Sequence, residues 1–548
     1  MATSKRRNRL SELRDTLATL VRARLLTPLS PDKYIRMVAA VRREGTSTTI
    51  GIATSARRCP DRPALVDEIG TLSYKELDVR CNALAAALQA LPKGTPQTIG
   101  IMCRNHRGFV EALAAANKVG ADVLLLNTSF AGPALAEVVA REGVDAVVYD
   151  EEFTGAVERA LADNFRCRRI IGWTDDPDSH DVTVEKLIAA HTGQRPAKAT
   201  RSGKLILLTS GTTGTPKGAK HSGGGPKELK VLLERVPWHA EETTVIAAPM
   251  FHAWGLGQLL MSTIMACTVV TRRKFDPQAT LELVDRYRAS GLSVVPVMLD
   301  RIMDLPDAIL QEYSGRSLRF VNASGSRMRP DVVIAFMDRF GDIVYNNYNA
   351  TEAGMITVAT PEDLRAAPDT AGRPAVGTEL RILDDDFRPL NAGQIGQIFV
   401  HNSSQFDGYT SGNTKDFHEG FMASGDVGYL DDAGRLFVVG RDDEMIISGG
   451  ENVYPIEVER TLVEHDEVAE ASVIGIDDEK YGQRLVAFVV LENGASATPE
   501  TLKQHIRDSL ASYKVPRDIA VLDELPRNST GKILRSELQA RAAADDAS

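Results

Sequence analysis

The sequence predicts an α/β fold. A large N-terminal domain with parallel sheets, flanking helices and a small β subdomain precedes a smaller α+β C-terminal domain. Three observations support this: short apolar runs alternate with helical patterns, strand-like patterns dominate from about Gly377, and a mixed pattern follows Asp443. The chain has 548 residues, and at roughly 100–200 residues per domain this length indicates several structural units.

The early part of the chain has the alternation typical of βαβ units. Short apolar runs and longer periodic runs predict the strands Thr98–Cys103, Asp122–Leu126, Asp145–Tyr149 and Arg169–Trp173, with the helices His106–Val119 and Pro133–Arg141. Strands that alternate with helices form a parallel sheet with helices on both faces. A further buried strand, Lys204–Thr209, leads into a loop rich in glycine, serine and threonine.

The same alternation returns later and then gives way to β structure. The expected strands are Leu292–Met298, Leu318–Asn322 and Ile343–Tyr348, followed by the antiparallel Glu379–Leu383, Gln394–His401 and a hairpin at Asp431–Gly434. The Asp-Ala-Gly tripeptide between two apolar runs is the turn signal for this hairpin. A boundary near Arg441–Asp443 gives a leader of residues 1–50, an N-terminal domain of residues 51–441 and a C-terminal domain of residues 442–548.

One apolar stretch imitates a membrane span. Thr243–Thr271 contains no Asp, Glu, Lys or Arg, and a spanning helix needs about 20 apolar residues. Proline, histidine, glycine and polar residues interrupt the stretch, as at Pro249, His252, Gly255 and Gly257. We therefore interpret it as a strand, a turn and a buried helix, with a membrane segment as the less favoured alternative.

The N-terminal leader is basic and amphipathic. Residues 1–44 carry eleven Lys/Arg and four Asp/Glu, a balance of +7 in a chain whose net charge is −10. One helical face of Arg9–Leu26 holds the apolar residues Leu10, Leu13, Leu17, Leu20 and Val21, and the other face is rich in arginine. The favoured interpretation is a helix packed on the main domain, and the alternative is peripheral attachment to an anionic membrane surface.

Charge and cysteine content limit the class of protein. The negative net charge argues against a general nucleic-acid binder. The five cysteines include no CxxC pair and are odd in number, which is typical of reduced thiols in a cytoplasmic protein. The N-terminal charges are not followed by a continuous apolar core, so the segment is not a signal peptide. We expect a cytoplasmic location, with contact at the inner membrane surface as the alternative for the leader.

The strongest local signal is the segment Leu208–Gly218, LTSGTTGTPKG. Its glycines and hydroxyl residues cannot form a stable helix or strand, but they can present backbone N–H groups and hydroxyls to a phosphate. Lys217 adds a positive charge. Pro216 precedes this lysine and Gly218 follows it, so the segment is not a Walker A loop. A flexible linker is the alternative, and the buried strand directly before the loop argues against it.

This loop resembles the phosphate loop of the acyl-adenylate-forming (AMP-binding) superfamily, which includes acyl-CoA synthetases, luciferases and peptide-synthetase adenylation domains. Single matches are weak, but together they are specific, and the resemblance covers roughly residues 50–540. Further segments match in the family's order and spacing: Pro249–His252, Asn322–Ser326, Tyr345–Ala353, Ser424–Asp426, Arg441–Met445, Ser448–Pro455 and Pro526–Arg535. The resemblance implies the adenylate-forming enzyme fold, with ATP, Mg²⁺ and coenzyme A as cofactors.

The resemblance also implies a nucleotide site. Tyr348 would stack on adenine, Thr351 would hydrogen-bond the α-phosphate, and Asp426 would accept hydrogen bonds from the ribose hydroxyls. Glu352 and Thr209 would bind Mg²⁺, a hard cation that prefers oxygen ligands. Asn349 stands where glycine is common in the family, which leaves the backbone geometry there open. The implied cofactor-binding set is Thr209, Ser210, Gly211, Thr212, Thr213, Gly214, Lys217, Ser324, Gly325, Ser326, Tyr348, Thr351, Asp426, Arg441, Gly449, Gly450 and Lys532.

The implied reaction brings two anions together, because a carboxylate must attack the α-phosphate of ATP. Positioning and stabilisation by cations and N–H groups can do most of this work. The resemblance gives catalytic roles to Lys532, Glu352, Thr351 and His252, the last bordering the carboxylate and the adenylate. In the second step a thiol must reach the acyl carbon, which Lys532 would obstruct. A hinge at Asp443 would exchange this lysine for the Gly449–Gly450 loop.

The substrate is less sharply defined than the reaction. Pro249–Leu256 offers no acidic residue that could hold an α-ammonium group, which disfavours an amino acid. The apolar segment Trp254–Met265 favours a fatty acid, so we expect an ATP-dependent fatty acyl-CoA synthetase of fatty acid metabolism, with acyl-AMP as the intermediate. The alternatives are a fatty-acyl-AMP ligase that loads a carrier protein, a light-emitting oxygenase and a catalytically silent nucleotide-binding protein. Chain length of the acid and oligomeric state are not predicted.

Overall fold

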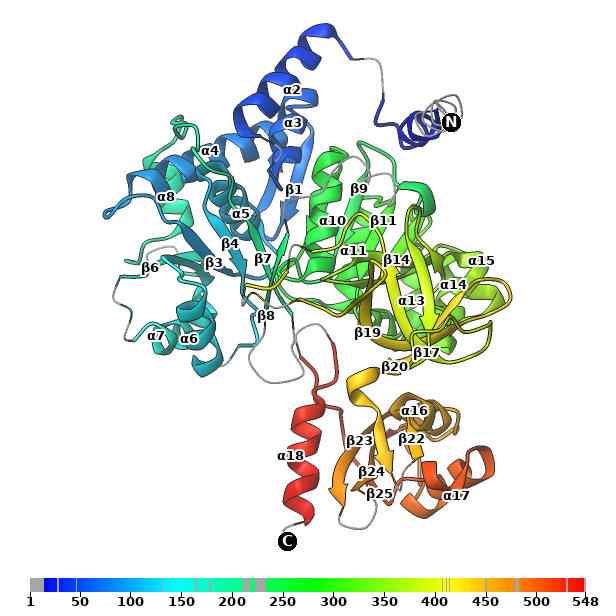
Figure 1. The fold of residues 1–548 in the computed structure, drawn as a ribbon. Coiled ribbons are helices and arrows are strands. Elements are labelled where there is room, and N and C mark those ends of the chain that lie inside the picture. The colour runs from blue at the N-terminus through cyan, green and yellow to red at the C-terminus, as the bar shows by residue number, and fades with distance from the viewer. Residues whose placement is uncertain are drawn as a thin grey trace. The chain divides into compact units, whose positions relative to one another are not determined.

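The computed structural model describes residues 14–546 apart from residues 27–28, 46, 131, 163, 165, 177–178, 210–216, 222–232, 407, 411, 413, 449–450, 479–481 and 529–530. The chain forms two compact units (Figure 1). Unit 1 comprises Met1–Thr378 and Asn402–Thr414, and unit 2 comprises Glu379–His401 and Lys415–Ser548. The β subdomain expected within the N-terminal domain is thus grouped with the C-terminal part of the chain in unit 2. The hinge expected at Asp443 remains a prediction.

A six-stranded sheet with the order β6-β5-β3-β4-β7-β8 forms part of unit 1. Paired strands are parallel, except that β8 runs antiparallel to β7. The strands are β3 (Thr98–Met102), β4 (Asp122–Leu125), β5 (Ala146–Asp150), β6 (Arg168–Trp173), β7 (Leu205–Thr209) and β8 (Lys217–His221). The accompanying helices are α5 (Arg107–Val119), α6 (Gly132–Arg141), α7 (Thr154–Ala160) and α8 (Val184–Ala190). The strands and helices predicted here are confirmed, with ends that differ by one residue.

The second sheet of unit 1 has nine strands in the order β15-β14-β13-β12-β11-β9-β10-β1-β2, and its central strands are parallel. The strands are β1 (Pro63–Asp67), β2 (Gly70–Ser73), β9 (Thr243–Ile246), β10 (Thr268–Thr271), β11 (Gly291–Val294), β12 (Phe320–Ala323), β13 (Val344–Ala350), β14 (Gly354–Ala359) and β15 (Arg373–Pro374). The helices are α2 (Pro31–Glu44), α3 (Ile50–Arg58), α4 (Tyr74–Ala90), α10 (Ala253–Ile264), α11 (Pro277–Arg286), α12 (Pro296–Met303), α13 (Asp307–Glu312), α14 (Pro330–Phe340) and α15 (Pro361–Ala366).

One predicted strand is too long. The expected strand Leu292–Met298 ends at Val294, and Pro296 opens α12 instead. Proline has no N–H to donate to a sheet, and its fixed φ suits the first turn of a helix. The apolar run therefore spans two elements that are both buried.

In the apolar stretch Thr243–Thr271, the predicted strand, turn and buried helix are confirmed as β9, the turn after it and α10. The last four residues form a second strand, β10, which was not predicted. Among the described residues, no helix has both the length and the apolar character needed to cross a membrane.

The main core of unit 1 surrounds α4 and α5. Residues Ala112–Ala116 of α5 are all at most 1% exposed, so this helix is covered on every side. Side chains from both sheets contribute to the same cluster, among them Ile101 of β3 and Ile246 of β9. This core fixes the carboxyl ends of the strands that carry the candidate site.

The leader packs only in part. Residues 14–22 are helical, and Leu20 packs with Ala23 in a cluster that contains Trp238. Leu17 and Val21 stay exposed, at 51% and 60%. Leu10 and Leu13 lie outside the described residues. The expected apolar face is therefore covered at Leu20 but not at Leu17 or Val21.

Unit 2 contains two five-stranded sheets. The first is antiparallel, as predicted, with β16 (Glu379–Leu383), β17 (Gly396–His401), β18 (Phe417–His418), β19 (Phe421–Leu430) and β20 (Leu436–Arg441). The second holds β21 (Ile446–Ser448), β22 (Glu451–Val453), β23 (Val468–Asp478), β24 (Gly482–Leu491) and β25 (Asp518–Val521), with helices α16 (Pro455–Val463), α17 (Pro499–Ser509) and α18 (Arg535–Asp546). The hairpin predicted at Asp431–Gly434 is confirmed as the turn between β19 and β20.

Candidate active site

The phosphate-loop segment connects the last two strands of the six-stranded sheet. Strands β7 and β8 form an antiparallel pair, with Leu208 opposite Gly218 and Thr209 opposite Lys217. The predicted residues Ser210, Gly211, Thr212, Thr213 and Gly214 lie outside the described residues, as do the side chains of Thr209 and Lys217. The fold therefore fixes the two ends of the loop, and the roles of its residues stay predictions.

A segment near residue 409 links the end of this loop to Glu352. Tyr409 forms a backbone bridge with Ala219, and the Thr410 N–H donates to the carbonyl oxygen of Gly218 at 2.8 Å. The Tyr409 hydroxyl donates to Oε1 of Glu352 at 2.7 Å. A Cβ added at Gly218 would lie 2.9 Å from the Thr410 side chain, so the close approach requires glycine. Tyr409 belongs to none of the recognised motifs and lies in a loop without periodicity, so its role was not predicted from the sequence.

Glu352 is suited to hold a divalent cation together with phosphate oxygens. The half-buried residues Thr351 and Glu352 follow β13 in a turn. The Phe406 N–H donates to the Glu352 carbonyl oxygen at 2.8 Å, while Tyr409 orients the carboxylate. A carboxylate oriented through one oxygen and beside hydroxyl side chains offers the hard oxygen ligands that Mg²⁺ prefers. The residues present therefore fit the predicted cation, which when bound would neutralise charge on the phosphates.

The predicted adenine-side residues lie at the carboxyl ends of β12 and β13, which are parallel neighbours. The buried Ser324 hydroxyl donates to the carbonyl oxygen of Asn347 at 2.6 Å, and Gly325 takes a φ of +111°. Tyr348 is half-buried, whereas Ser326 is exposed. In open α/β sheets, ligands bind at such carboxyl ends.

Asn349, which stands where glycine is common in the family, lies in ordinary extended backbone. Asn349 is paired with Met355 in the extended β13–β14 ladder, next to a bulge, and it is not among the residues with positive φ. The backbone therefore does not require glycine at this position.

His252 occupies the N-cap position of α10 without a capping hydrogen bond from its side chain, and one of its ring nitrogens has no partner among the described residues. Its Nε2 atom is buried and makes no hydrogen bond to any residue that the structure describes, although the residue as a whole is half-buried. Asn105, from the loop after β3, fixes the preceding turn: its Nδ2 donates to Ala248 O at 2.9 Å, and its Oδ1 accepts from Met250 N at 2.8 Å. Burial lowers the pKa of His252 from 6.5 to about 4. The imidazole is therefore neutral at physiological pH.

This lowered pKa predicts a pH-dependent loss of stability. Between pH 6.5 and pH 4 the unfolded chain binds a proton at His252 and the folded chain does not, so stability falls as pH falls through this window. At pH 4.5 the contribution amounts to about 2 kcal/mol. Replacing the imidazole in His252→Asn should make the free energy of unfolding less dependent on pH, as measured by urea denaturation at pH 7 and pH 4.5. The exposed His180→Asn serves as the control, and an unchanged pH dependence in His252→Asn would contradict the assignment.

A buried polar row lies between α10 and the nine-stranded sheet. Gln258 of α10 accepts hydrogen bonds through Oε1 from the Ser293 hydroxyl at 3.0 Å and from Asn322 Nδ2 at 3.4 Å. Ser293 and Asn322 are opposite each other on β11 and β12. Each of the three residues is at most 3% exposed. The sequence analysis described α10 only as apolar and missed this row, because its members are far apart in the chain.

Two amide oxygens on the same face of the sheet have no hydrogen-bond partner in the described part of the chain. They are Oδ1 of Asn322 and Oδ1 of Asn347, both buried. Asn322 is opposite Tyr345 in the register, and side chains alternate along a strand, so Asn347 points to the same face as Asn322. Buried acceptors of this kind need a water or ligand donor. The α10 face of the sheet therefore has unused hydrogen-bonding capacity near its carboxyl edge.

Unit 2 carries the predicted ribose-binding pair. Asp426 of β19 and Arg441 of β20 are opposite each other, with Oδ1 and Nε 3.8 Å apart. The Ser424 hydroxyl accepts from the Asp426 N–H at 3.1 Å, and Gly425 takes a φ of +86°. A Cβ at Gly425 would lie 3.1 Å from Lys415 Nζ, so glycine keeps this turn open for the lysine. The arrangement offers one carboxylate and two cations to a polar ligand.

Among the remaining predicted residues of unit 2, Asp443 and Lys532 lie in turns or loops. Asp443 falls in a 3-10 turn, Asp442–Glu444, and its side chain is outside the described residues, as is the whole of Gly449–Gly450 between β21 and β22. Lys532 is exposed in a tight loop, where its N–H donates to Asn528 Oδ1 at 2.9 Å. Gly531 before it takes a φ of +78°. The loop thus presents the Lys532 side chain outward from a fixed backbone.

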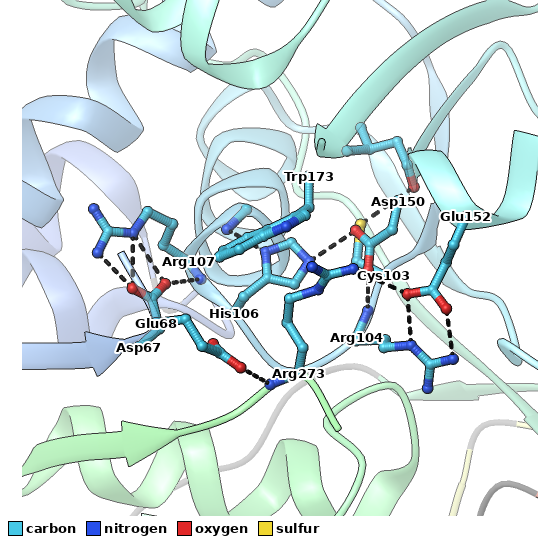
Figure 2. Close-up of polar contacts among 12 residues, drawn as sticks. Asp67, Glu68, Cys103, Arg104, His106, Arg107, Asp150, Glu152, Trp173 and Arg273 are labelled. Carbon is cyan, nitrogen blue, oxygen red and sulfur yellow. Dashed lines mark hydrogen bonds and ion pairs between the residues drawn. The ribbon is translucent and has the colours of Figure 1, made fainter. Parts of the chain in front are cut away.

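Cys103, His106 and Asp150 form a buried cluster of metal-ligand type (Figure 2). His106 Nδ1 accepts from the Gly108 N–H at 3.0 Å, so its proton is on Nε2, which donates to Asp150 Oδ1 at 2.7 Å. Burial raises the pKa of the Cys103 thiol well above its usual value. A metal ion needs a thiolate and a deprotonated ring nitrogen. The cluster therefore fits a structural hydrogen-bond network and not a metal site.

The comparisons with known proteins agree with this fold. The family model "AMP-binding enzyme" matches residues 52–410, and "AMP-binding enzyme C-terminal domain" matches residues 457–532. The chain therefore belongs to the AMP-binding enzyme family. Its class is that of the adenylate-forming acid–CoA ligases, which use ATP, Mg²⁺ and coenzyme A.

Relatives within the family differ in their acids and acceptors. A 2-succinylbenzoate–CoA ligase of Geobacillus sp. (strain WCH70) is 32% identical over 494 residues, which covers 88% of this chain and 94% of the relative. The fatty acid–[acyl-carrier-protein] ligase ScoC of Streptomyces coeruleorubidus is 28% identical over 518 residues, covering 90% and 96%. The o-succinylbenzoate CoA synthetase (MenE) of Bacillus subtilis, solved with its acyl-adenylate intermediate OSB-AMP, has a TM-score of 0.76 and 27% identity, covering 89% and 97%.

Proposed function

We propose that this chain joins a carboxylic acid to coenzyme A in two steps. A carboxylate oxygen attacks the α-phosphorus of ATP and pyrophosphate leaves, which gives the acyl-adenylate. The coenzyme A thiol, losing its proton, then attacks the acyl carbon and AMP leaves. The observation that carries the proposal is the hydrogen-bonded link from the end of the phosphate loop through Tyr409 to Glu352. This link would hold a phosphate-binding loop and a cation-binding carboxylate in fixed relation.

The proposed roles of the other site residues follow the resemblance. Lys532 would neutralise the carboxylate and the α-phosphate during adenylation, and Asp426 with Arg441 would hold the ribose. His252, neutral and with a buried Nε2, would border the acyl carboxylate. Asp443 would serve as the hinge that brings Gly449–Gly450 into use for the thiol step.

The substrate acid is proposed to combine an apolar body with a hydrogen-bond donor. The apolar residues of α10 alone favour the fatty acid of the sequence analysis. The buried acceptors Asn322 Oδ1 and Asn347 Oδ1 favour instead a hydroxyl, amine or similar group on the acid. A site that hydrogen-bonds such a group discriminates strongly against analogues that lack it. An aromatic acid of the kind named for the succinylbenzoate ligase relatives supplies the rigid apolar body.

The test is pyrophosphate release with a panel of acids. The panel contains saturated C2–C24 acids and aromatic acids in pairs with and without a hydroxyl or amino group, and mass spectrometry identifies the CoA product. Donor-bearing acids should have the higher kcat/KM, and Asn322→Leu should reduce that preference by roughly tenfold. The matched control is Ser472→Ala. Like Asn322→Leu it removes a buried polar atom without a partner among the described residues, but in unit 2. If no acid releases pyrophosphate, the proposed adenylation is refuted. If the two acids of each pair react at equal rates, only the proposed preference for a hydrogen-bond donor is refuted.

A carrier protein is the second candidate acceptor, because the fatty acid–[acyl-carrier-protein] ligase covers 90% of this chain. In that case the acyl-adenylate would accumulate with free coenzyme A and be consumed only on addition of a phosphopantetheinylated carrier protein. The same mass spectrometry assay distinguishes the two acceptors.

The link through Tyr409 gives a separate prediction. Tyr409→Phe removes the hydroxyl that donates to Glu352 Oε1 and keeps the ring. A hydrogen bond to a charged group is worth about 1.5–3 kcal/mol, part of which water restores, so we expect the Mg²⁺ concentration for half-maximal pyrophosphate release to rise roughly fivefold to tenfold. The exposed Tyr513→Phe is the control. An unaltered Mg²⁺ requirement would assign Tyr409 to packing alone.

A further inference from the structure

Helix α2 does not pack its most apolar face against the body of unit 1. The side of α2 that is turned inward carries Lys33, Met37, Ala40 and Glu44, which recur at helical spacing. Of these four residues only Ala40 is fully buried. Glu44 Oε1 pairs with Lys118 Nζ at 2.7 Å, and Arg43 donates to the carbonyl oxygen of Pro196 at 3.1 Å. These contacts tie the end of the helix to the body of unit 1.

Three aliphatic residues of α2 lie on its exposed side. Ile35, Val38 and Val41 are 70%, 50% and 37% exposed. A surface helix normally turns its apolar stripe toward the core, and large exposed apolar patches mark interaction sites. A shallow hollow of about 690 Å³ follows this face and is lined by Tyr34, Ile35, Val38, Ala39, Arg42, Arg43 and Lys198.

The positive charge around this hollow indicates what kind of partner it can bind. Arg42, Arg43 and Lys198 border it, and the two acids of α2 are paired with other cations, Asp32 with Arg36 and Glu44 with Lys118. A second copy of the chain would bring the same cations together across a two-fold axis. Residues 1–13 of this chain are also basic and would be repelled. A surface that is both apolar and anionic matches the patch.

We propose that α2 docks the protein on an anionic lipid bilayer, with Ile35, Val38 and Val41 entering the boundary between headgroups and acyl chains. Arg42, Arg43 and Lys198 contact the lipid phosphates. From the sequence, membrane contact is the alternative for the basic residues 1–44 as a whole, and the exposed face of α2 locates it within that segment. The inference does not depend on the identity of the acid or of the acyl acceptor.

Sedimentation of the full chain with vesicles tests the proposal. Binding should be strong with phosphatidylcholine–phosphatidylglycerol (7:3) vesicles, weak with pure phosphatidylcholine, and weaker as salt rises. The double variant Ile35→Ser/Val38→Ser should lower the affinity for anionic vesicles about tenfold. Arg42→Glu should lower binding to anionic vesicles only. Pyrophosphate release in the absence of lipid should not change in these variants, because they lie outside the candidate site.

The matched control is Val79→Ser/Val182→Ser, which removes two other exposed apolar side chains of unit 1. The proposal is overturned if the wild type does not bind anionic vesicles or if the control and α2 variants lose binding equally. It is also overturned if Ile35→Ser/Val38→Ser abolishes a dimer in analytical ultracentrifugation while vesicle binding persists, because a second copy then covers the face.

Discussion

We expect Lys532→Ala to abolish ATP–pyrophosphate exchange while thioester formation from a preformed acyl-adenylate remains largely intact. Adenylation brings a carboxylate against the α-phosphate, and a cation that neutralises the developing charge contributes a factor of roughly 10²–10³ or more. The second step starts from an adenylate whose carboxyl charge is already gone, so it does not need the lysine. The two half-reactions are measured separately, by isotope exchange and by mass spectrometry of the CoA product.

The structure makes Lys532 a clean target. Its side chain is exposed, and its loop is held by backbone contacts with Asn528 that an alanine preserves. Lys503→Ala on α17 is the control for loss of a lysine in the same unit. Equal loss of both half-reactions would show that the residue supports the fold or binds nucleotide generally, and would remove it from the catalytic set.

Most elements of the fold are predictable because burial in this chain follows local patterns. Strands such as β3 are short, mostly apolar and buried, and they alternate with helices of clear period. The exception near Pro296 shows the limit of this approach: one apolar run continues through a strand, a turn and a helix, and only the proline marks the change. The exposure of α2 was not predictable, because an apolar stripe indicates burial and only the packed structure shows which face is covered.

Some residues of the candidate site could likewise be predicted from the sequence and others could not. Residues within continuous motifs, such as Glu352 and Lys532, can be identified from sequence since the motif fixes their neighbours. Tyr409 and the row of Gln258, Ser293 and Asn322 could not be identified as partners, because strand register and helix packing bring them together across 35 or more residues. The unpartnered amide oxygens of Asn322 and Asn347 lie within motif segments, but the motifs do not show that both are buried on one face of the sheet. The proposed hydrogen-bond donor on the acid rests on this arrangement, which only the packed structure shows.

Glu352→Gln should reduce adenylation by roughly 10²–10³ and weaken its dependence on Mg²⁺. Glutamine keeps the shape of the side chain and can still accept the hydrogen bond from Tyr409, so the turn after β13 and the link to the phosphate loop are preserved. What it lacks is the negative charge that binds a hard cation. The experiment is pyrophosphate release titrated with Mg²⁺ at saturating ATP and acid, with thermal unfolding to confirm the fold.

The exposed Glu362→Gln on α15 controls for loss of one carboxylate in unit 1. The combination with Tyr409→Phe makes the test sharper, because residues that act through one carboxylate are not additive. If Tyr409 acts by orienting the Glu352 charge, then Tyr409→Phe should cost little once that charge is gone. A full additional loss in the double variant would mean that the two residues act independently, and the link from phosphate loop to cation would then have no role in the chemistry.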